Sequence, residues 1–330
     1  MLLTISIPTH NSTHYLDEAL QSIIKEPGLG VFYEITLSDN SLTSDTEYLY
    51  RTKYINIKGI NYHRSTESPC LDSNVNNAVE LAKGDYVWIF GDDDLLIPGS
   101  LKEILSYVNK YQPSILVVNS QSFNQEGLIE KSRVPLKTNL FYSEKQNNKF
   151  MAELGSYLTY IGAIVVNKEL WIKNFDKRRI GSYFAHLNAI LKIKINRTAI
   201  FLSRECIKMR VGSQTWTNKS FEIWNINFAE IIWSLKKYDE ISKNKVIIRY
   251  PFHSLKSILS SRAYGRITFN VWKRTIFKSK KISISFKLFI LIISLMPRIL
   301  FKLVYKIYIL KNRKNHTLHF SPKLALAQLN

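Results

Sequence analysis

The chain has 330 residues, of which 45% are hydrophobic, and this is enough to form a sizeable core in one or two domains. Only two cysteines are present, Cys70 and Cys206, which argues against a disulfide framework and a cysteine-based zinc site. The net charge of +20 favours a phosphate-bearing partner, such as nucleic acid, anionic lipid or a phosphorylated substrate. No basic stretch precedes the first apolar residues, so we expect no secretory signal and a reducing, cytosolic environment.

Short apolar runs alternate with amphipathic segments along the first part of the chain. Strands are expected over residues 2–8, 34–39, 60–64, 86–90, 114–119, 161–166 and 198–202. Helices are expected over residues 16–24, 45–52, 72–82, 100–108, 149–158 and 181–193, with Gly84 as a left-handed cap after the third and a polar surface excursion over residues 125–147. This alternation predicts an α/β fold with a mostly parallel sheet flanked by helices. No glycine-rich dinucleotide fingerprint and no P-loop sequence occurs.

An acidic cluster follows the fourth expected strand. Asp92, Asp93 and Asp94 come one residue after a run of five apolar residues, with Gly91 between. Such a run predicts a buried parallel strand, and ligands bind beyond the carboxyl ends of these strands in open α/β sheets. Adjacent carboxylates repel one another unless a cation neutralises them, and hard oxygen ligands suit Mg²⁺ or Mn²⁺. The three residues alone leave open the alternative of a solvated acidic turn at a helix start.

Residues 216–330 predict a helical C-terminal region with a strongly basic part. Residues 271–314 contain twelve Lys or Arg and no Asp or Glu. Their longest charge-free run, residues 288–297, is too short for the roughly 18 residues that cross a bilayer. A basic, apolar, amphipathic helix favours an anchor on an anionic membrane surface. Two alternatives stay open: nucleic-acid binding, which we do not expect beside so many bare apolar side chains, and a core helix with snorkelling lysines.

Four motifs occur in order in the N-terminal part of the chain. They are Ser6–Asn11, Ser38–Ser41, Glu80–Tyr86 and Gly91–Asp94, the last followed by Pro98. Together they resemble the family 2 glycosyltransferases, which have the nucleotide-sugar-binding fold called GT-A. The resemblance covers roughly residues 1–110 well and the rest thinly. It implies a catalytic domain over residues 1–215.

The resemblance also implies roles for individual residues. The residues implied to contact the nucleotide are Pro8, Thr9, Asn11, Asp39, Asn40 and Arg64. Among these, Thr9 and Asp39 are implied to hold the base and ribose. Asp92 and Asp94 stand as the carboxylates of the D-x-D motif, with Asp93 able to replace one of them. They are implied to bind Mg²⁺ or Mn²⁺, which bridges the diphosphate and neutralises the charge that builds on the leaving group.

The chain departs from this family where the acceptor base is expected. Most members carry an acidic pair at the start of a helix well after the metal motif, and its aspartate deprotonates the acceptor hydroxyl. The corresponding stretch, residues 180–187, contains no acid, so the candidate catalytic residues are His186, Asp176 upstream of it and Asp94 of the acidic turn. A histidine with a near-neutral pKa can act as a general base. Two alternatives stay open: His186 only packs, or front-face substitution with retention needs no protein base.

Three further features resemble a subgroup that adds dideoxyhexoses to O-antigen units, the abequosyltransferases. They are the Gly-Ser-Tyr-Phe-x-His stretch ending at His186, the Gly-Asp-Asp-Asp turn, and Ser213-x-x-Trp216. The subgroup implies a CDP-dideoxyhexose donor and a lipid-linked oligosaccharide acceptor. We therefore expect a metal-dependent glycosyltransferase that is peripheral to the cytoplasmic face of the inner membrane. The rivals are a non-catalytic nucleotide-sugar-binding or scaffold protein and a basic nucleic-acid-binding protein.

Overall fold

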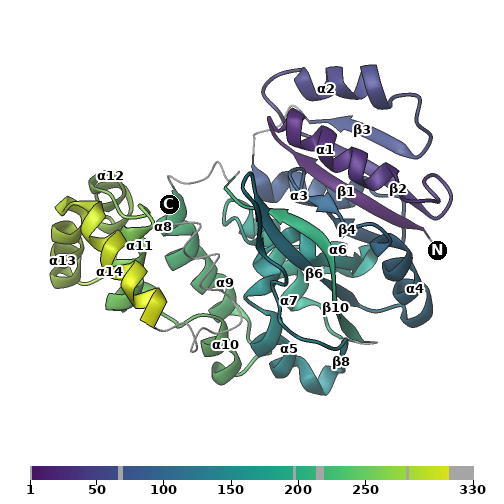
Figure 1. Cartoon of the computed structure of the whole chain (residues 1–330). Coiled ribbons are helices and arrows are strands. Elements are labelled where there is room, and N and C mark those ends of the chain that lie inside the picture. Colours follow the sequence, from purple (N-terminus) through teal and green to yellow (C-terminus); the bar gives the residue numbers. More distant parts are fainter. Residues whose placement is uncertain (1, 66–69, 196–197, 213–218, 280–281, 312–330) are drawn as a thin grey trace. The chain divides into compact units, whose positions relative to one another are not determined.

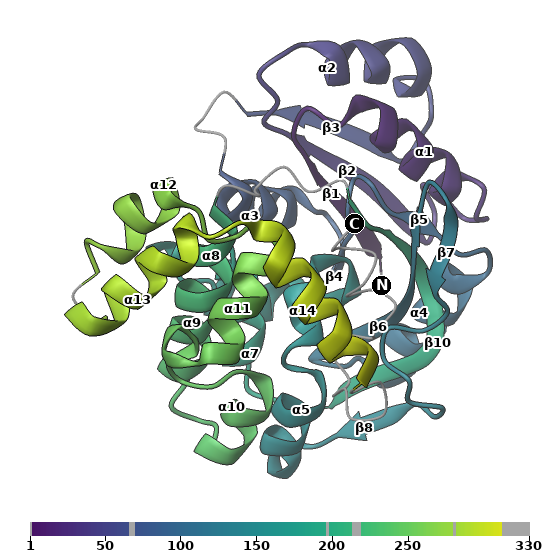
Figure 2. The same cartoon turned by 60° about the vertical axis from the view of Figure 1, so that its left-hand side comes forward.

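The chain forms two compact units, residues 1–210 and 211–330. The structure is a computed structural model, and it describes residues 2–65, 70–195, 198–212, 219–279 and 282–311. The first unit is built on a ten-stranded sheet with helices packed on it, and the described residues of the second unit are helical (Figure 1; Figure 2). Ser213 and Trp216, which belong to one of the motifs above, lie outside the described residues.

The sheet of the first unit is mixed. Its strands are β1 (Leu3–Thr9), β2 (Tyr33–Asp39), β3 (Ile60–Arg64), β4 (Tyr86–Ile89), β5 (Leu95–Leu96), β6 (Ile115–Asn124), β7 (Gly127–Glu130), β8 (Leu140–Tyr142), β9 (Ile164–Asn167) and β10 (Ala199–Arg210). Their order is β3-β2-β1-β4-β9-β6-β10-β5, with β7 added to β6 and β8 to β10. Strands β1 to β4 run parallel, as do β6 and β10, whereas β9 runs antiparallel to β4 and β6. The predicted α/β class is confirmed.

Helices of the first unit cover this sheet. They are α1 (Thr13–Ile24), α2 (Asp45–Leu49, continued by a π-helical turn to Tyr54), α3 (Leu71–Leu81), α4 (Ser100–Tyr111), α5 (Asn147–Leu154), α6 (Lys168–Asn174) and α7 (Ala185–Lys192). Helix α3 packs on β1 and β2. Every residue of β1, β2 and β4 is buried, as expected for strands covered on both faces.

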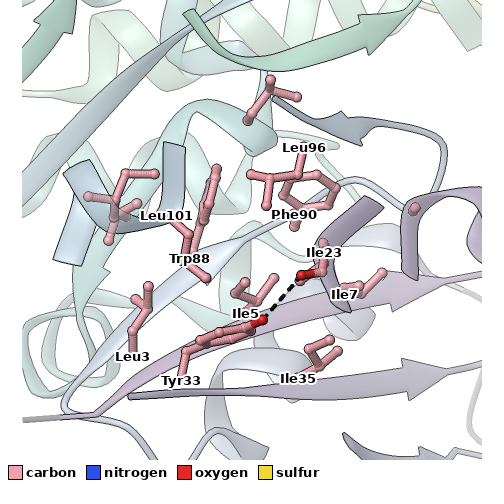
Figure 3. Packing of buried hydrophobic residues seen from close by; sticks show 14 of the residues in the cluster. Leu3, Ile5, Ile7, Ile23, Tyr33, Ile35, Trp88, Phe90, Leu96 and Leu101 are labelled. Atoms are coloured by element: carbon pink, nitrogen blue, oxygen red, sulfur yellow. Dashed lines mark hydrogen bonds between the residues drawn. The ribbon is translucent and has the colours of Figure 1, made fainter. Parts of the chain in front are cut away.

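The core of this unit joins strand residues to the helices above them. Trp88 and Phe90 pack edge to face, with ring centroids 5.3 Å apart, near Ile5 of β1 (Figure 3). The buried Tyr33 hydroxyl donates a hydrogen bond to the carbonyl oxygen of Ile23 at 3.1 Å, which ties β2 to the end of α1 (Figure 3). Alternate residues of the apolar runs, such as Trp88 and Phe90, therefore pack into this core on one face of the sheet.

Gly84 does not have the left-handed conformation that the sequence predicted for a helix cap, because its φ is not positive. Its backbone N–H instead donates to Thr4 Oγ1 at 2.8 Å. A Cβ at this position would lie 2.5 Å from the carbonyl oxygen of Leu2. Gly84 is therefore required by the close approach of two backbone segments at the start of β4.

Two segment predictions also need correction. Residues 125–147 lie largely at the surface, as expected, but they also supply β7 and β8 to the sheet, which was not expected. The helix expected over residues 181–193 begins only at Ala185, because residues 181–184 form a separate turn. Strand β7 pairs with the adjacent β6, whereas β8 pairs with the distant β10, and the turn before Ala185 is held by Asp72.

The second unit consists of helices among its described residues. They are α8 (Ser220–Glu222), α9 (Phe228–Ser234), α10 (Glu240–Val246), α11 (Leu255–Ala263), α12 (Phe269–Val271), α13 (Ile284–Leu295) and α14 (Arg298–Lys311). No single helix in the described part of the chain is long and apolar enough to cross a membrane. Helices α13 and α14 meet that length and composition only as a pair, and the pair is bent by 99°.

Candidate functional site

The carboxyl ends of the parallel strands bring the predicted nucleotide-binding residues together. Thr9 at the end of β1 pairs in register with Asp39 at the end of β2, and Asp39 pairs with Arg64 at the end of β3. Strand β4 lies on the other side of β1 and runs parallel to it. The acidic turn after β4 reaches the same edge, where the backbone N–H of His10 lies 3.4 Å from Asp92 Oδ2. Residues from three motifs thus share one edge of the sheet.

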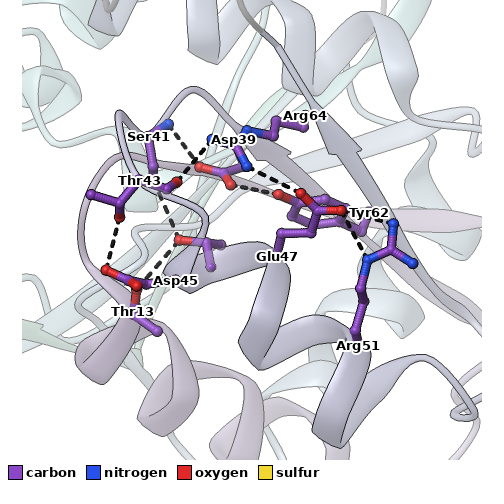
Figure 4. Close-up of polar contacts among 10 residues, drawn as sticks. Thr13, Asp39, Ser41, Thr43, Asp45, Glu47, Arg51, Tyr62 and Arg64 are labelled. Atoms are coloured by element: carbon purple, nitrogen blue, oxygen red, sulfur yellow. Dashed lines mark hydrogen bonds and ion pairs between the residues drawn. The ribbon is translucent and has the colours of Figure 1, made fainter.

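Asp39 is fully buried and hydrogen-bonded at this edge. Its Oδ1 accepts from the backbone N–H of Ser41 at 2.8 Å, and its Oδ2 accepts from the Tyr62 hydroxyl at 2.6 Å (Figure 4). The Tyr62 ring stacks on Tyr50 with centroids 5.0 Å apart. Burial, and then the Asp39 carboxylate, raise the pKa of Tyr62, so the phenol stays a donor. These two contacts fix the direction of the Asp39 carboxylate, and a ligand reaches its Oδ2 only where the Tyr62 hydroxyl gives way.

Arg64 is tied to the neighbouring turn rather than extended into the site. Its Nη1 pairs with Glu47 Oε2 at 3.1 Å, and its Nη2 donates to the carbonyl oxygen of Thr43 at 3.0 Å (Figure 4). Arg51 also pairs with Glu47. A contact from Arg64 to a base or phosphate would therefore compete with the Glu47 ion pair.

Asn74 of α3 links the first two motifs, a role that the sequence did not reveal. Its Nδ2 donates to the carbonyl oxygen of Thr9 at 3.0 Å and to Asn40 Oδ1 at 3.1 Å. Its Oδ1 accepts from the Ser38 hydroxyl at 2.8 Å. One buried amide therefore fixes the ends of both β1 and β2, and it is a positioning residue for the site.

The turn after β1 is held by its own polar groups. Asn11 has a positive φ of 53°, which asparagine tolerates better than most residues. Its backbone N–H donates to Ser41 Oγ at 2.8 Å, and its side-chain oxygen accepts from the backbone N–H of Leu42 at 3.0 Å. Pro8 is buried inside β1, opposite Ser38. Pro8 and Asn11 therefore shape the edge in this structure.

Within the acidic turn, Asp94 is buried and directed inward. Its Oδ2 accepts from the Tyr160 hydroxyl at 2.5 Å, and its Oδ1 accepts from the backbone N–H of Arg210 at 3.0 Å. Its carboxylate folds over Gly91, where any Cβ would collide with it, so this turn requires glycine there. Burial, and next the charge of Asp93, raise the pKa of Asp94 well above its usual range. Asp94 is thus a structural anchor of the turn.

Asp92 and Asp93 are half-buried and differ from Asp94 in this respect. Burial, and next the charge of Asp93, raise the pKa of Asp92 to about 7. In the part of the chain that the structure describes, no group of three or more His, Cys, Asp or Glu side chains could hold a metal ion alone. Two half-buried carboxylates still fit a Mg²⁺ or Mn²⁺ ion that takes its other ligands from substrate phosphates and water.

Arg210 holds the acidic turn from the far end of β10. Its Nε donates to the carbonyl oxygen of Asp93 at 2.9 Å, and its guanidinium pairs with Glu18 of α1. The guanidinium carbon lies 4.5 Å from the ring centroid of Tyr15 and 4.7 Å from that of Phe123. A cation between two aromatic rings therefore fixes the backbone of the turn and offsets part of its negative charge. No pattern in the sequence indicated this contact.

The two predicted bases outside the acidic turn are His186, which is buried, and Asp176, which is ion-paired. His186 is 3% exposed and its Nε2 has no hydrogen-bond partner among the described residues, and burial lowers its pKa to about 4. Asp176 pairs with Arg178 at 2.9 Å and with Lys192 at 3.0 Å. The Arg178 contact is the main cause that holds the pKa of Asp176 well below its usual value. Burial in the first case and ion pairing in the second weigh against a role as base.

The buried carboxylate of Asp72 lies beside residues 180–187, the stretch that contains no acid of its own. Asp72 at the start of α3 accepts hydrogen bonds from the backbone N–H groups of Gly181 at 2.9 Å, Tyr183 at 2.8 Å and Ala185 at 3.1 Å. Asp72 thereby holds, from another helix, the turn that leads into α7, in which Tyr183 has a φ of +67°, and it accepts from the first N–H of α7. The sequence placed Asp72 at a helix start, but its partners lie more than a hundred residues away.

Comparisons with known proteins agree on one family. Residues 4–163 match the model of glycosyl transferase family 2. The chain is 30% identical over 207 residues to the abequosyltransferase RfbV of Salmonella typhimurium, which spans 58% of this chain and 61% of that protein. It is 27% identical over 111 residues to the GalNAc(5)-diNAcBac-PP-undecaprenol beta-1,3-glucosyltransferase of Campylobacter jejuni, over 33% of this chain and 35% of that protein.

A solved structure shows the same fold. The crystal structure of Staphylococcus aureus TarS 1-349 in complex with UDP-GlcNAc superposes with a TM-score of 0.56 at 15% identity, over 83% of this chain and 81% of that one. This likeness establishes the GT-A fold of the chain. In sequence, the chain spans less than two thirds of the length of the curated relatives that it matches first.

Proposed function

This chain belongs to glycosyl transferase family 2 through its residues 4–163, and we propose that it transfers a sugar from a nucleotide-sugar donor to an acceptor hydroxyl. The observation that carries the proposal is the convergence of three motifs at one sheet edge. Thr9 and Asp39 are register partners there, and Asp92 lies within 3.4 Å of the backbone after Thr9. Ligand sites of open α/β sheets lie at this end of the strands.

The oriented groups at this edge fit the parts of a nucleotide sugar. Asp39 is the proposed carboxylate acceptor for base or ribose donors, where the Tyr62 hydroxyl that occupies its Oδ2 gives way to the ligand. Asn40 and Asn11 hold the turns beside it, and Arg64 reaches a phosphate if its pair with Glu47 opens. Donor recognition is thus assigned to side chains that are oriented before the ligand arrives, except Arg64, whose pair with Glu47 must open first.

A divalent ion is the proposed cofactor, and Asp92 and Asp93 are its proposed protein ligands. Asp94 has both oxygens engaged by Tyr160 and by the backbone of Arg210, so it holds the turn that presents the other two. When bound, Mg²⁺ or Mn²⁺ supplies charge neutralisation at the leaving diphosphate. The carboxylates of this chain then serve to position the diphosphate relative to Asp39.

The names of the relatives support a narrower substrate class. One is an abequosyltransferase, and another acts on a PP-undecaprenol-linked glycan according to its name. We therefore place the donor among CDP-dideoxyhexoses and the acceptor among lipid-linked oligosaccharides of O-antigen or surface polysaccharide synthesis. Such an acceptor is confined to a membrane, so the enzyme must work at its surface.

Residues of the second unit support a location at the cytoplasmic face of the inner membrane. Helices α13 and α14 expose many large apolar side chains, including Ile284 at 77% and Leu295 at 65%. Lysines 302 and 306 lie in α14, and lysines 273 and 278 precede α13. Apolar groups beside basic ones fit an anionic membrane surface better than nucleic acid.

The test is a melting-temperature screen of the full chain with UDP-, GDP-, CDP- and dTDP-sugars, with and without Mn²⁺. A donor at a hundred times its Kd stabilises the folded state by about 2.7 kcal/mol. We expect one donor class to raise the melting temperature, more so with Mn²⁺, and Asp92→Asn to abolish the added effect of Mn²⁺. Asp85→Asn is the matched control, because Asp85 is exposed at the opposite end of β4.

Two outcomes oppose the proposal in different ways. If no nucleotide sugar stabilises the wild-type chain under any condition, the donor site is wrongly assigned. If a donor binds but is neither hydrolysed nor transferred to a lipid-linked acceptor, the chain is the non-catalytic binding protein that the missing acidic pair allows.

A further inference from the structure

The acidic turn is held from a distant segment by Tyr160. The Tyr160 hydroxyl donates to Asp94 Oδ2 at 2.5 Å, although the two residues lie 66 positions apart in the sequence. The other carboxylate oxygen of Asp94 accepts from the backbone N–H of Arg210 at 3.0 Å. Asp94 is only 1% exposed, so these two donors decide the direction of its carboxylate.

The segment that carries Tyr160 is tied to the strand that leads into the acidic turn. Residues Ile161–Ala163 form a 3-10 turn that packs on β4 and β6. Trp88 of β4 is fully buried, and its Nε1 donates to the carbonyl oxygen of Gly162 at 2.8 Å. Trp88 precedes Asp92 by only four residues. The Tyr160 side chain is therefore fixed relative to the strand from which the acidic turn emerges.

Two glycines leave room for the contact between Tyr160 and Asp94. A Cβ at Gly162 would lie 2.5 Å from both Cζ and the hydroxyl oxygen of Tyr160. A Cβ at Gly91 would collide with the Asp94 carboxylate. Neither glycine has a positive φ, so the close approach of a side chain, rather than the backbone conformation, requires glycine at both positions. The space on both sides of this hydrogen bond is thus kept free by the sequence.

A fixed Asp94 restricts Asp92 and Asp93, which lie between it and Gly91. The backbone N–H of Asp94 donates to the carbonyl oxygen of Gly91 at 3.3 Å, which closes the turn. Asp92 and Asp93 are the half-buried carboxylates of this turn and the proposed metal ligands. A metal ion binds more tightly to carboxylates whose direction is set by neighbouring groups before it arrives. Tyr160 can therefore act on metal binding through Asp94 without being a ligand itself.

We propose that Tyr160 is a positioning residue for the divalent ion and acts through Asp94 on the two proposed metal ligands. The hydroxyl fixes the Asp94 carboxylate, and Asp94 fixes the backbone that presents the other two carboxylates. This role rests on the proposed function, because that function assigns the metal to Asp92 and Asp93. Two other roles predict different results when the hydroxyl is lost. A tyrosine that only packs leaves the metal affinity unchanged, and one that withholds Asp94 from the ion raises it.

The test measures Mn²⁺ binding by the full chain, alone and with CDP or UDP, from the electron paramagnetic resonance signal of the free ion. Tyr160→Phe removes the hydroxyl and keeps the ring, whereas Gly162→Ala displaces the hydroxyl and leaves both partners unchanged. We expect each to weaken Mn²⁺ binding about 10–100-fold, as the loss of a partner that orients a metal ligand does. Tyr157→Phe is the matched control, because the buried Tyr157 hydroxyl donates to the carbonyl oxygen of Val118 in β6 at 3.0 Å. We expect its Mn²⁺ affinity to be unchanged.

Circular dichroism and the melting temperature establish that each variant is folded, and both tyrosine variants lose one hydrogen bond. Equal Mn²⁺ affinities of Tyr160→Phe and Tyr157→Phe would overturn the proposal. Tighter Mn²⁺ binding by Tyr160→Phe would do so as well, because the hydroxyl would then withhold Asp94 from the ion. So would the absence of Mn²⁺ binding by the wild-type chain. If Mn²⁺ binding depends on Tyr160 but no nucleotide sugar stabilises the wild-type chain, only the proposed function fails.

Discussion

Replacement of Arg210 by methionine tests whether this side chain supports the acidic turn. The arginine side chain is 12% exposed, and methionine keeps most of its apolar stem. The two ring contacts are worth about 0.5–1 kcal/mol each. A charged donor to the Asp93 carbonyl oxygen adds about 1.5–3 kcal/mol, and the pair with Glu18, which is 40% exposed, adds at most about 1 kcal/mol.

These contributions overlap, so we expect Arg210→Met to lower the free energy of unfolding by about 3 kcal/mol. Arg204→Met is the control, because Arg204 lies on the same strand and makes the same kinds of contact, an ion pair with Glu103 and a hydrogen bond to the carbonyl oxygen of Pro98, but is 46% exposed and lacks the two aromatic rings. We expect it to cost less than about 1 kcal/mol. Urea unfolding followed by near-ultraviolet circular dichroism measures both variants. Equal losses in the two variants would refute the assignment of Arg210 as the anchor of the turn.

Two further substitutions address the predicted bases. His186→Gln should lower the melting temperature while kcat stays within about threefold, because the ring is buried away from solvent; a fall of a hundredfold or more in kcat with unchanged stability would restore His186 as the general base. The pKa of Asp176 is depressed, so its contribution to stability is full above about pH 4, its usual pKa, and is lost as the pH falls further. Melting curves of wild type and Asp176→Asn should therefore differ at pH 7 and converge toward pH 2, and a constant difference would contradict the ion-pair assignment.

The local sequence was sufficient to predict most strands of the sheet and the order of the motifs along the chain. The apolar runs that became β1, β2 and β4 are continuous, and burial on both faces requires such runs. Because these strands are parallel, their ends meet at one edge, so the proximity of Thr9, Asp39 and Asp92 followed from the strand order. The sequence could not foresee the direction of β9, since an apolar strand has the same pattern in either orientation.

Only the tertiary structure distinguishes the buried Asp94 from the half-buried Asp92 and Asp93 in the acidic turn. Three adjacent aspartates look equivalent in the sequence, yet Asp94 is buried because Tyr160 and Arg210 reach it from distant segments. In the same way Asp72 became the acceptor for a turn more than a hundred residues away. The residue types and their order determined that carboxylates able to bind a cation or accept hydrogen bonds lie in this turn. Which carboxylate faces the ligand depends on long-range contacts, because burial and hydrogen bonding, rather than sequence position, fix the direction of a charged side chain.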